Sequence, residues 1–183
     1  MISKNNYREF NPLTSEFLTA RKRAKKLCQQ INATSSDQNK LRAPLLQQLF
    51  GKVSSAFIEP NFFCDYGYNI SIGEKFFANH NCIFLDAEKI TIGDRVLLGP
   101  NVHLYTTTHP TNARKRAMGI QLIAPVDIGN DCWIGGNTVV MPGVSIGSGS
   151  IIGAGSVVTT SIPSDVIAVG SPCKVIRQVN PDD

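Results

Sequence analysis

A six-residue period in the second half of the chain constrains the fold more than any other feature. An aliphatic residue recurs every six positions at Ile128, Ile134, Val140, Ile146, Ile152 and Val158. A residue of limited size follows four positions after each of them, at Cys132, Thr138, Val144, Ser150, Ser156 and Ile162. This period is neither the 2 of a strand nor the 3.6 of a helix. It is typical of a chain that runs straight, turns through about a third of a circle and repeats.

Earlier segments fit the same template, as in Ile72-Gly73 and Leu98-Gly99. Between Phe84 and Ile92 the register slips by two residues, which predicts a small insertion near Glu88. Three six-residue repeats close one triangular coil, with aliphatic residues filling the prism and glycines relieving steric restriction at the turns. We therefore predict an all-β main body built as a parallel β-helix. The period leaves its hand open, although most parallel crossovers are right-handed.

The N-terminal residues show helical spacing instead. Apolar residues follow one helical face from Thr14 to Ile31, and a second short amphipathic segment runs from Leu41 to Phe50 with Pro44 at its start or at a kink. We predict a helical cap over residues 1–55 and a β-helix domain with a C-terminal tail over residues 56–183. Cap and tail are placed to cover the open ends of the coil.

Composition and charge narrow the class of protein. A chain of 183 residues suits one main body with a small appendage. It has no run of about 20 apolar residues and a polar stretch from Met1 to Phe10, so we expect a cytoplasmic protein without a membrane partner. Five cysteines without a C-x-x-C pair predict reduced, mostly buried thiols. The basic run from Arg21 to Lys26 lacks interleaved aromatic residues, which favours a solvated helix face or an anion-binding patch over a nucleic-acid site.

The repeats fail after Leu104 and resume at Leu122 or Ile128, and the segment between is polar and carries His109 followed by Pro110. A long polar loop ejected from a regular coil, directly after a core strand, favours a functional role. A histidine at such a position suits a general base for a substrate hydroxyl group.

Two other chemistries are less favoured. A zinc site on His80, His103 and His109 would need neighbouring ligands, whereas the six-residue offset from His103 to His109 places the second around a corner. Serine nucleophiles would have to be Ser150 or Ser156, which are corner residues without a G-x-S-x-G motif.

Several strings, in this order and spacing, resemble the maltose, galactoside and nodulation-factor O-acetyltransferases among the hexapeptide acyltransferases. The resemblance covers nearly the whole chain and rests on Arg21-x-Arg23-Ala24, Cys64 to Ile70, Phe76 to Asn79, Thr108-His109-Pro110, Trp133 to Gly136, Gly153 to Ser156 and Val169 to Arg177. It implies a left-handed β-helix and a homotrimer with active sites between subunits. It also implies acetyl transfer from acetyl-CoA to a sugar hydroxyl group, without a catalytic metal.

The resemblance assigns roles to individual residues. His109 matches the catalytic general base. The matches on the acceptor side are Asp65, Asn79, Asp86 and Asn11. The matches along the coenzyme A groove are Trp133, Gly136, Ala154, Thr159, Lys174 and Arg177. Their chemistry fits, because a backbone N–H at Gly136 suits a tetrahedral oxyanion and cationic side chains suit phosphates.

Structural roles remain open for some of these residues. Asp65 and Asn79 could satisfy turns of the coil, Trp133 could pack at a subunit contact, and Lys174 and Arg177 could be ordinary surface charges on the tail.

Two departures qualify the resemblance. Thr160 stands where the family often has lysine, and Ala87 replaces a second acidic residue of the galactoside branch, which makes the chain more similar to the maltose branch. Two other functions stay open: acetylation of an antibiotic or other small molecule on the same scaffold, and a non-enzymatic trimeric assembly module.

Overall fold

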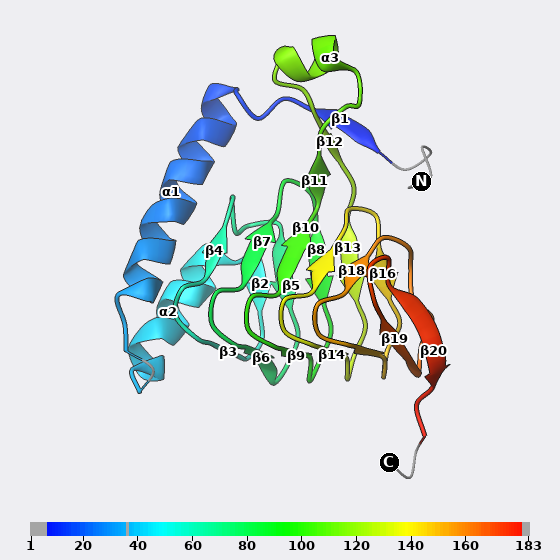
Figure 1. The fold of residues 1–183 in the computed structure, drawn as a ribbon. Helices are drawn as coiled ribbons and strands as arrows, with labels where there is room; N and C mark the ends of the chain where they lie inside the picture. The colour runs from blue at the N-terminus through cyan, green and yellow to red at the C-terminus, as the bar shows by residue number, and fades with distance from the viewer. Residues whose placement is uncertain (1–6, 36, 181–183) are drawn as a thin grey trace.

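The structure is a computed structural model that describes residues 7–35 and 37–180 (Figure 1). Its main body is a left-handed parallel β-helix with three faces. Face 1 consists of β2 (Lys52–Val53), β5 (Ile70–Ile72), β8 (Ile90–Ile92), β13 (Val126–Ile128) and β16 (Ser145–Ile146). Face 2 consists of β3 (Ala56–Ile58), β6 (Phe76–Ala78), β9 (Leu97–Leu98), β14 (Trp133–Ile134), β17 (Ile151–Ile152), β19 (Val166–Val169) and β20 (Lys174–Gln178). Face 3 consists of β4 (Phe63–Cys64), β7 (Ile83–Leu85), β10 (His103–Tyr105), β15 (Val139–Val140) and β18 (Val157–Val158).

The chain visits the faces in the order 1, 2, 3, and from the second coil up to β19 each strand of the three faces pairs in parallel with the strand one coil earlier. Ile92 pairs with Ile128, which pairs with Ile146, so the aliphatic residues of successive repeats stack inside the prism. All six residues of the period from Ile128 to Val158 are buried. The fold predicted from the period is confirmed.

The glycines of the repeats are needed for a reason other than the one expected. The positive φ angles at many corners belong to other residues, such as Asp131 and Asn137. Gly129 and Gly135 instead lie where the next coil comes close. A Cβ atom on Gly135 would stand 2.5 Å from the backbone nitrogen of Ala154, so only glycine fits between the coils there.

The N-terminal cap closes the first coil with α1 (Ser15–Asn32) and α2 (Asn39–Leu49) (Figure 1). Thr14 is the N-cap of α1, and its side chain accepts a hydrogen bond from the N–H of Phe17. Helix α2 starts before Leu41 and runs through Pro44. Strand β2 already belongs to the coil, although it lies within the segment assigned to the cap.

Arg42, on α2, is a buried cation that joins the cap to the coil. Its guanidinium group donates hydrogen bonds to the carbonyl of Ile58 on β3, to the carbonyl of Ser35 and to the hydroxyl of Thr34. These bonds give each of its three nitrogens an acceptor and fix α2 against the first coil. The sequence pattern gave no sign of this role.

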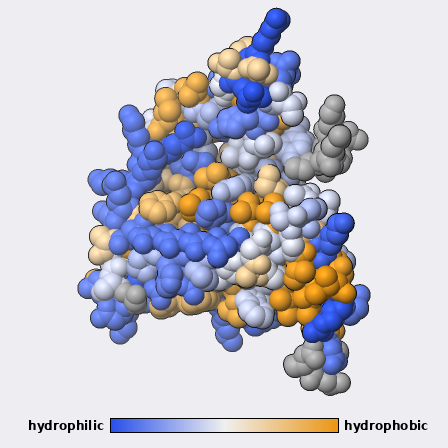
Figure 2. Space-filling model, in the orientation of Figure 1, coloured by the Kyte–Doolittle hydropathy of each residue, from blue (hydrophilic) through white to orange (hydrophobic). Residues whose placement is uncertain are grey.

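The C-terminal end is closed by an antiparallel pairing of β19 with β20. It exposes Val169, Val175 and Ile176. Figure 2 shows a hydrophobic patch at the lower right, where β20 lies in Figure 1. The five cysteines are free and buried, as predicted. Within residues 7–35 and 37–180, no helix has the length and apolar character needed to span a membrane.

The outward side chains differ sharply between the three faces. The outward row of face 1 is polar: Lys52, Ser71, Thr91, Asp127 and Ser145. The outward row of face 2 is apolar: Phe57, Phe77, Leu97, Trp133, Ile151 and Ile167. The outward row of face 3 is mostly apolar: Phe63, Ile83, His103, Val139 and Val157. Two of the three faces therefore have the surface character of a contact region.

Candidate active site

One edge of the prism carries all the irregular turns. Edge 3/1, between faces 3 and 1, has long turns on three successive coils, at residues 65–69, 86–89 and 106–125, and a short one at residues 141–144. The second turn is the insertion predicted near Glu88. The first was missed, although the eight-residue spacing from Cys64 to Ile72 is the same signal.

The third turn is an ordered hairpin, which projects from the coil at the top of Figure 1. It contains β11 (Thr107–Thr108), α3 (Ala113–Ala117) and β12 (Gln121–Ile123). Strand β12 pairs antiparallel with β11 and also with the N-terminal strand β1 (Arg8–Phe10). The N–H of Ala124 donates to the carbonyl of Thr106 at 2.9 Å and closes the neck of the hairpin.

His109 follows β11 directly and is exposed, whereas Pro110 is buried. Nη1 of Arg116 donates to the carbonyl oxygens of Pro110 and Thr111 at 2.9 and 2.8 Å. The backbone after His109 is thus fixed by a side chain of the same loop, and the imidazole is left accessible to a substrate.

The hairpin is also tied to the N-terminal segment by charge. Nζ of Lys115 lies 2.7 Å from Oε1 of Glu9, and Nη2 of Arg8 lies 2.6 Å from Oε2 of Glu88 in the second turn of the edge. These exposed pairs add little stability each. Together with the β1–β12 pairing, they place the N-terminal strand against the loop that carries His109.

Asp86 is fully buried, and its carboxylate holds the neighbouring turn. Oδ1 accepts the N–H groups of Asp65 and Tyr66 at 3.0 and 2.8 Å, and Oδ2 accepts that of Gly67 at 2.7 Å. Burial raises its pKa to about 7, and the N–H donors of Tyr66 and Gly67 oppose the rise. Its oxygens face the turn, and the contact with the acceptor that the resemblance implies for Asp86 stays a prediction.

Asp65 is partly accessible on the same turn. Its Oδ1 lies 3.5 Å from Nε of Arg21 on α1. Burial raises the pKa of Asp65, and the charges of Arg21 and Lys25 oppose the rise. A cavity of about 320 Å³ opens beside it between α1 and face 3 and is lined by Lys25, Cys28, Gln29, Phe63, Cys64, Asp65 and Leu85.

The other predicted residues lie elsewhere on the chain. Asn79, Gly136 and Ala154 lie on edge 2/3, between faces 2 and 3, at residues 79–82, 135–138 and 153–156. Oδ1 of Asn79 accepts the N–H of His80 at 2.8 Å. Thr159 lies on edge 3/1, on the turn two coils after the one that carries His109. In one chain, Asn79 and the glycine-rich corner are thus on a different edge from His109 and Asp65.

The backbone at Gly136 has an unused donor. The N–H groups of Gly135 and Asn137 donate to carbonyls of neighbouring coils at 2.7 and 2.8 Å. The N–H of Gly136 donates to no residue within the described part of the chain. It is therefore available to a ligand oxygen on edge 2/3.

Trp133 and Arg177 share face 2. The register row runs from Trp133 through Ile151 and Ile167 to Arg177, and the indole is 54% exposed. Lys174 is exposed at the start of β20. A ligand along this row would meet an aromatic side chain at one end and cations at the other.

Asn11 joins β1 to α1, and its Oδ1 accepts the N–H of Leu13 at 3.0 Å. Its local role is to shape that turn.

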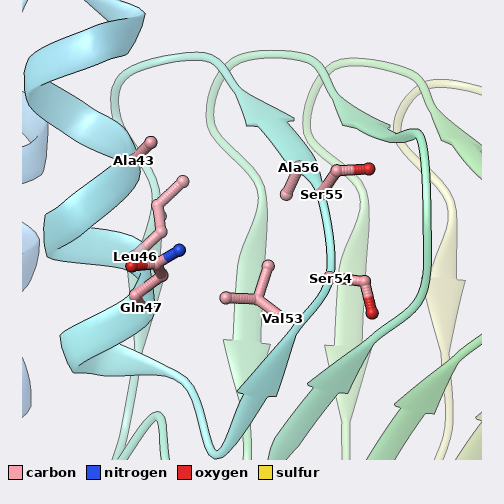
Figure 3. Close-up of a pocket in the computed structure, with 7 residues that line it drawn as sticks. All are labelled: Ala43, Leu46, Gln47, Val53, Ser54, Ser55 and Ala56. Atoms are coloured by element: carbon pink, nitrogen blue, oxygen red, sulfur yellow. The ribbon is translucent and has the colours of Figure 1, made fainter.

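A second cavity contributes nothing to this site. It measures about 50 Å³ and lies between α2 and the strands β2 and β3 (Figure 3). Its lining residues are Ala43, Leu46, Gln47, Val53, Ser54, Ser55 and Ala56, of which none is a candidate site residue. Across residues 7–35 and 37–180, no three His, Cys, Asp or Glu side chains are grouped to hold a metal ion.

Comparison with known proteins gives matches along most of the chain. Residues 125–160 match the bacterial transferase hexapeptide model of six repeats, and residues 8–54 match the maltose acetyltransferase hexapeptide capping motif. Galactoside O-acetyltransferase of Escherichia coli is 43% identical over 89% of this chain and 81% of its own length.

Two solved structures share the fold. A maltose O-acetyltransferase from Clostridium difficile 630 superposes with a TM-score of 0.92 at 46% identity, covering 95% of this chain and 94% of that one. A galactoside acetyltransferase in complex with coenzyme A superposes with a TM-score of 0.93 at 41% identity, covering 96% and 88%.

Proposed function

This chain belongs to the hexapeptide-repeat acetyltransferases, the family of the galactoside and maltose O-acetyltransferases, and we propose that it transfers the acetyl group of acetyl-CoA to a hydroxyl group of a sugar. The observation that carries the sugar assignment is the presence of two groups on the same edge, edge 3/1. An accessible imidazole, His109, stands on the hairpin, and a partly accessible carboxylate, Asp65, lies on a turn of the same edge. A base and a hydroxyl-binding carboxylate suit a polyol acceptor.

In the proposed reaction, the imidazole of His109 removes the proton of the acceptor hydroxyl group. The acceptor oxygen attacks the thioester carbonyl carbon, and a tetrahedral oxyanion forms. Its collapse breaks the carbon–sulfur bond, and the imidazolium returns the proton to the coenzyme A thiolate. The free N–H of Gly136 is the candidate donor to the oxyanion.

Coenzyme A is proposed to lie along face 2 and edge 2/3. Trp133 offers an apolar surface to the pantetheine chain, and Ala154 and Gly136 leave room beside it. Lys174 and Arg177 suit the phosphates, because cationic side chains form charge-assisted hydrogen bonds with phosphate oxygens. Thr159 is carried as a further contact from the resemblance alone.

We propose a homotrimer with active sites between subunits. In one chain, His109 and Asp65 lie on edge 3/1, while Gly136 and Asn79 lie on edge 2/3, so a site with all four needs two copies. The apolar faces 2 and 3 support this assembly. A contact between two different faces of neighbouring copies closes into a ring when the rotation from one copy to the next is a simple fraction of a circle, which is a third of a circle for a trimer.

The test is a screen of acceptors with coenzyme A release as the readout. Mono- and disaccharides are compared with hydroxyl-bearing antibiotics at equal concentration. We expect a sugar to give the highest kcat/KM. Release with an antibiotic and none with any sugar would reject the sugar assignment. Calorimetry with acetyl-CoA is the companion measurement, since absence of binding would favour a non-enzymatic assembly module.

A further inference from the structure

We infer that Arg21, on the cap helix α1, is a positioning residue for the acceptor: it supplies the charge that holds Asp65 as a carboxylate and leaves the carboxylate oxygens free for hydroxyl groups. The inference rests on the proposed function. It also extends that function, because it defines the acceptor as a carbohydrate that presents hydroxyl groups to Asp65 in addition to the reacting one.

The guanidinium group of Arg21 has a fixed place. Its Nη2 donates to the hydroxyl of Tyr66 at 2.8 Å, and its central carbon lies 5.2 Å from the centre of the Tyr66 ring. Tyr66 is fully buried and packs edge-on against Phe10 and Phe17. A side chain held by a hydrogen bond and by a ring contact has little freedom to leave.

The ion pair between Arg21 and Asp65 lacks a hydrogen bond. The distance from Nε to Oδ1 is 3.5 Å, beyond the usual range for N–H···O bonds. Nε is buried without an acceptor, and no donor within the described residues bonds to the Asp65 carboxylate. Attraction between the charges persists at this distance, while the lone pairs of the carboxylate remain available.

Another ion pair of the chain shows the contrast. Arg95 and Asp131 form two hydrogen bonds, of 2.6 and 2.8 Å, which occupy both carboxylate oxygens. Such a carboxylate has less capacity left for a ligand. The Arg21–Asp65 geometry instead combines neutralised charge with free acceptor oxygens, which is what a hydroxyl-binding carboxylate requires.

The groups around Asp65 give this arrangement a pH signature. Arg21 and Lys25 of α1 are the cations near it, Asp86 fixes its backbone N–H, and Tyr66 and Cys64 are its chain neighbours. Because the charge of Arg21 opposes the rise in the pKa of Asp65, its removal lets that pKa rise further. The acceptor KM would then begin to increase at a higher pH as the solution is acidified.

The test compares Arg21→Met with Arg21→Lys, using maltose as the acceptor. Arg21→Met keeps length and removes charge, so we expect the acceptor KM to rise about tenfold with the acetyl-CoA KM unchanged. Arg21→Lys should recover part of the loss. Lys22→Met, an exposed change on the same helix, is the matched control and should leave both KM values unchanged.

A double-mutant comparison separates positioning from general structure. In an Asp65→Asn background, Arg21→Met should add little to the acceptor KM, because the two residues act together. Tyr66→Phe, which only removes the hydroxyl group, should give a smaller rise than Arg21→Met and keeps the test open if Arg21→Met does not fold.

An Arg21→Met enzyme with an unchanged acceptor KM, or with an unshifted pH profile of that KM, would overturn the inference. So would equal rises in both KM values together with a lower Tm. These outcomes require an active wild-type enzyme. Failure of the proposed function is a different result, namely a wild type that acetylates no sugar.

Discussion

Asp65 and Asp86 lie on successive coils of edge 3/1, and the backbone N–H of Asp65 donates to Oδ1 of Asp86 at 3.0 Å. The carboxyl group of Asp86, which the resemblance matches to an acceptor contact, thus supports from inside the turn on which Asp65 lies. The relationship makes the stability of this turn depend on the protonation of a buried group.

The first prediction concerns Asp86→Asn and pH. Burial raises the pKa of Asp86 from 3.8 to about 7, so the folded chain binds this proton more tightly than the unfolded chain. Stability contributed by this group is therefore highest at acid pH and falls by about 4 kcal/mol between about pH 4 and pH 7. Asparagine removes that slope. Urea unfolding of both proteins across this range measures it.

The free energies of unfolding of the wild type and of Asp86→Asn should therefore depend differently on pH. They should not differ by the same amount at every pH. Asp94→Asn is the control, because Asp94 also accepts a backbone N–H, that of Glu74 at 2.7 Å, on another edge. Parallel curves for wild type and Asp86→Asn would contradict the prediction.

The second prediction concerns His109→Ala. Loss of a general base lowers kcat by about 10²- to 10⁴-fold, while acetyl-CoA affinity is expected to stay near that of the wild type. The residue is exposed on a hairpin outside the repeats, so folding should survive. Steady-state kinetics measure kcat, calorimetry measures the affinity for acetyl-CoA, and thermal unfolding measures the stability of the fold. A variant within about threefold of wild-type kcat would refute the role.

The third prediction concerns the backbone beside His109. Arg116→Ala removes both hydrogen bonds to the carbonyls of Pro110 and Thr111 and loosens the segment after the base. We expect kcat to fall by about tenfold, because the imidazole of His109 would then be held less often in the orientation that reaches the acceptor hydroxyl group. Arg114→Ala, an exposed change on the same helix α3, should leave kcat unchanged. Equal effects of the two changes would reject a specific role for Arg116.

The fourth prediction concerns coenzyme binding. Lys174→Ala combined with Arg177→Ala should raise the acetyl-CoA KM more than it lowers kcat. Contacts with phosphates far from the reacting carbon stabilise the bound substrate and the transition state equally, so their loss weakens binding without slowing the bound complex. Initial rates at saturating acceptor provide both constants. An unchanged coenzyme KM would exclude these residues from the groove.

The fifth prediction concerns assembly. Val139→Lys places a charge in the apolar row of face 3, and Ser145→Lys places the same charge in the polar row of face 1. The first should dissociate the proposed trimer and reduce activity, since an unpaired charge in a contact region is costly. The second should leave the sedimentation profile unchanged. A wild type that sediments as a fully active monomer would contradict the trimer itself.

The repeats predicted the coil because each six-residue repeat has the same pattern of residues, which can be recognised without knowing any long-range contact. Each aliphatic residue from Ile128 to Val158 repeats its position on a face, so the period alone places it in the prism. The break after Leu104 likewise located the hairpin. The same reasoning found the insertion near Glu88 and, applied earlier, would have found the turn after Cys64.

Other features depend on contacts between distant segments, which a pattern does not contain. The pairing of β1 with β12 joins Phe10 to Gln121 and has no local signature. Asp86 looks like an exposed polar residue in the sequence. The N–H groups that donate to its buried carboxyl group come from the neighbouring coil, which the local pattern does not contain. Arg42 is similar, because its acceptors lie on β3 and on the segment after α1.

The three long turns of edge 3/1 all belong to the first coils, and later turns of that edge are short. Successive coils are separated by about 4.8 Å, the spacing between paired strands. The number of short coils therefore sets how far β20 lies from the hairpin along the helix axis. Insertion or removal of one complete coil between β13 and β18 would lengthen or shorten that span in a single step. For coenzyme A placed as proposed above, the number of repeats would set the distance between the phosphate contacts on β20 and the reacting group near the hairpin, independently of the residues that perform the chemistry.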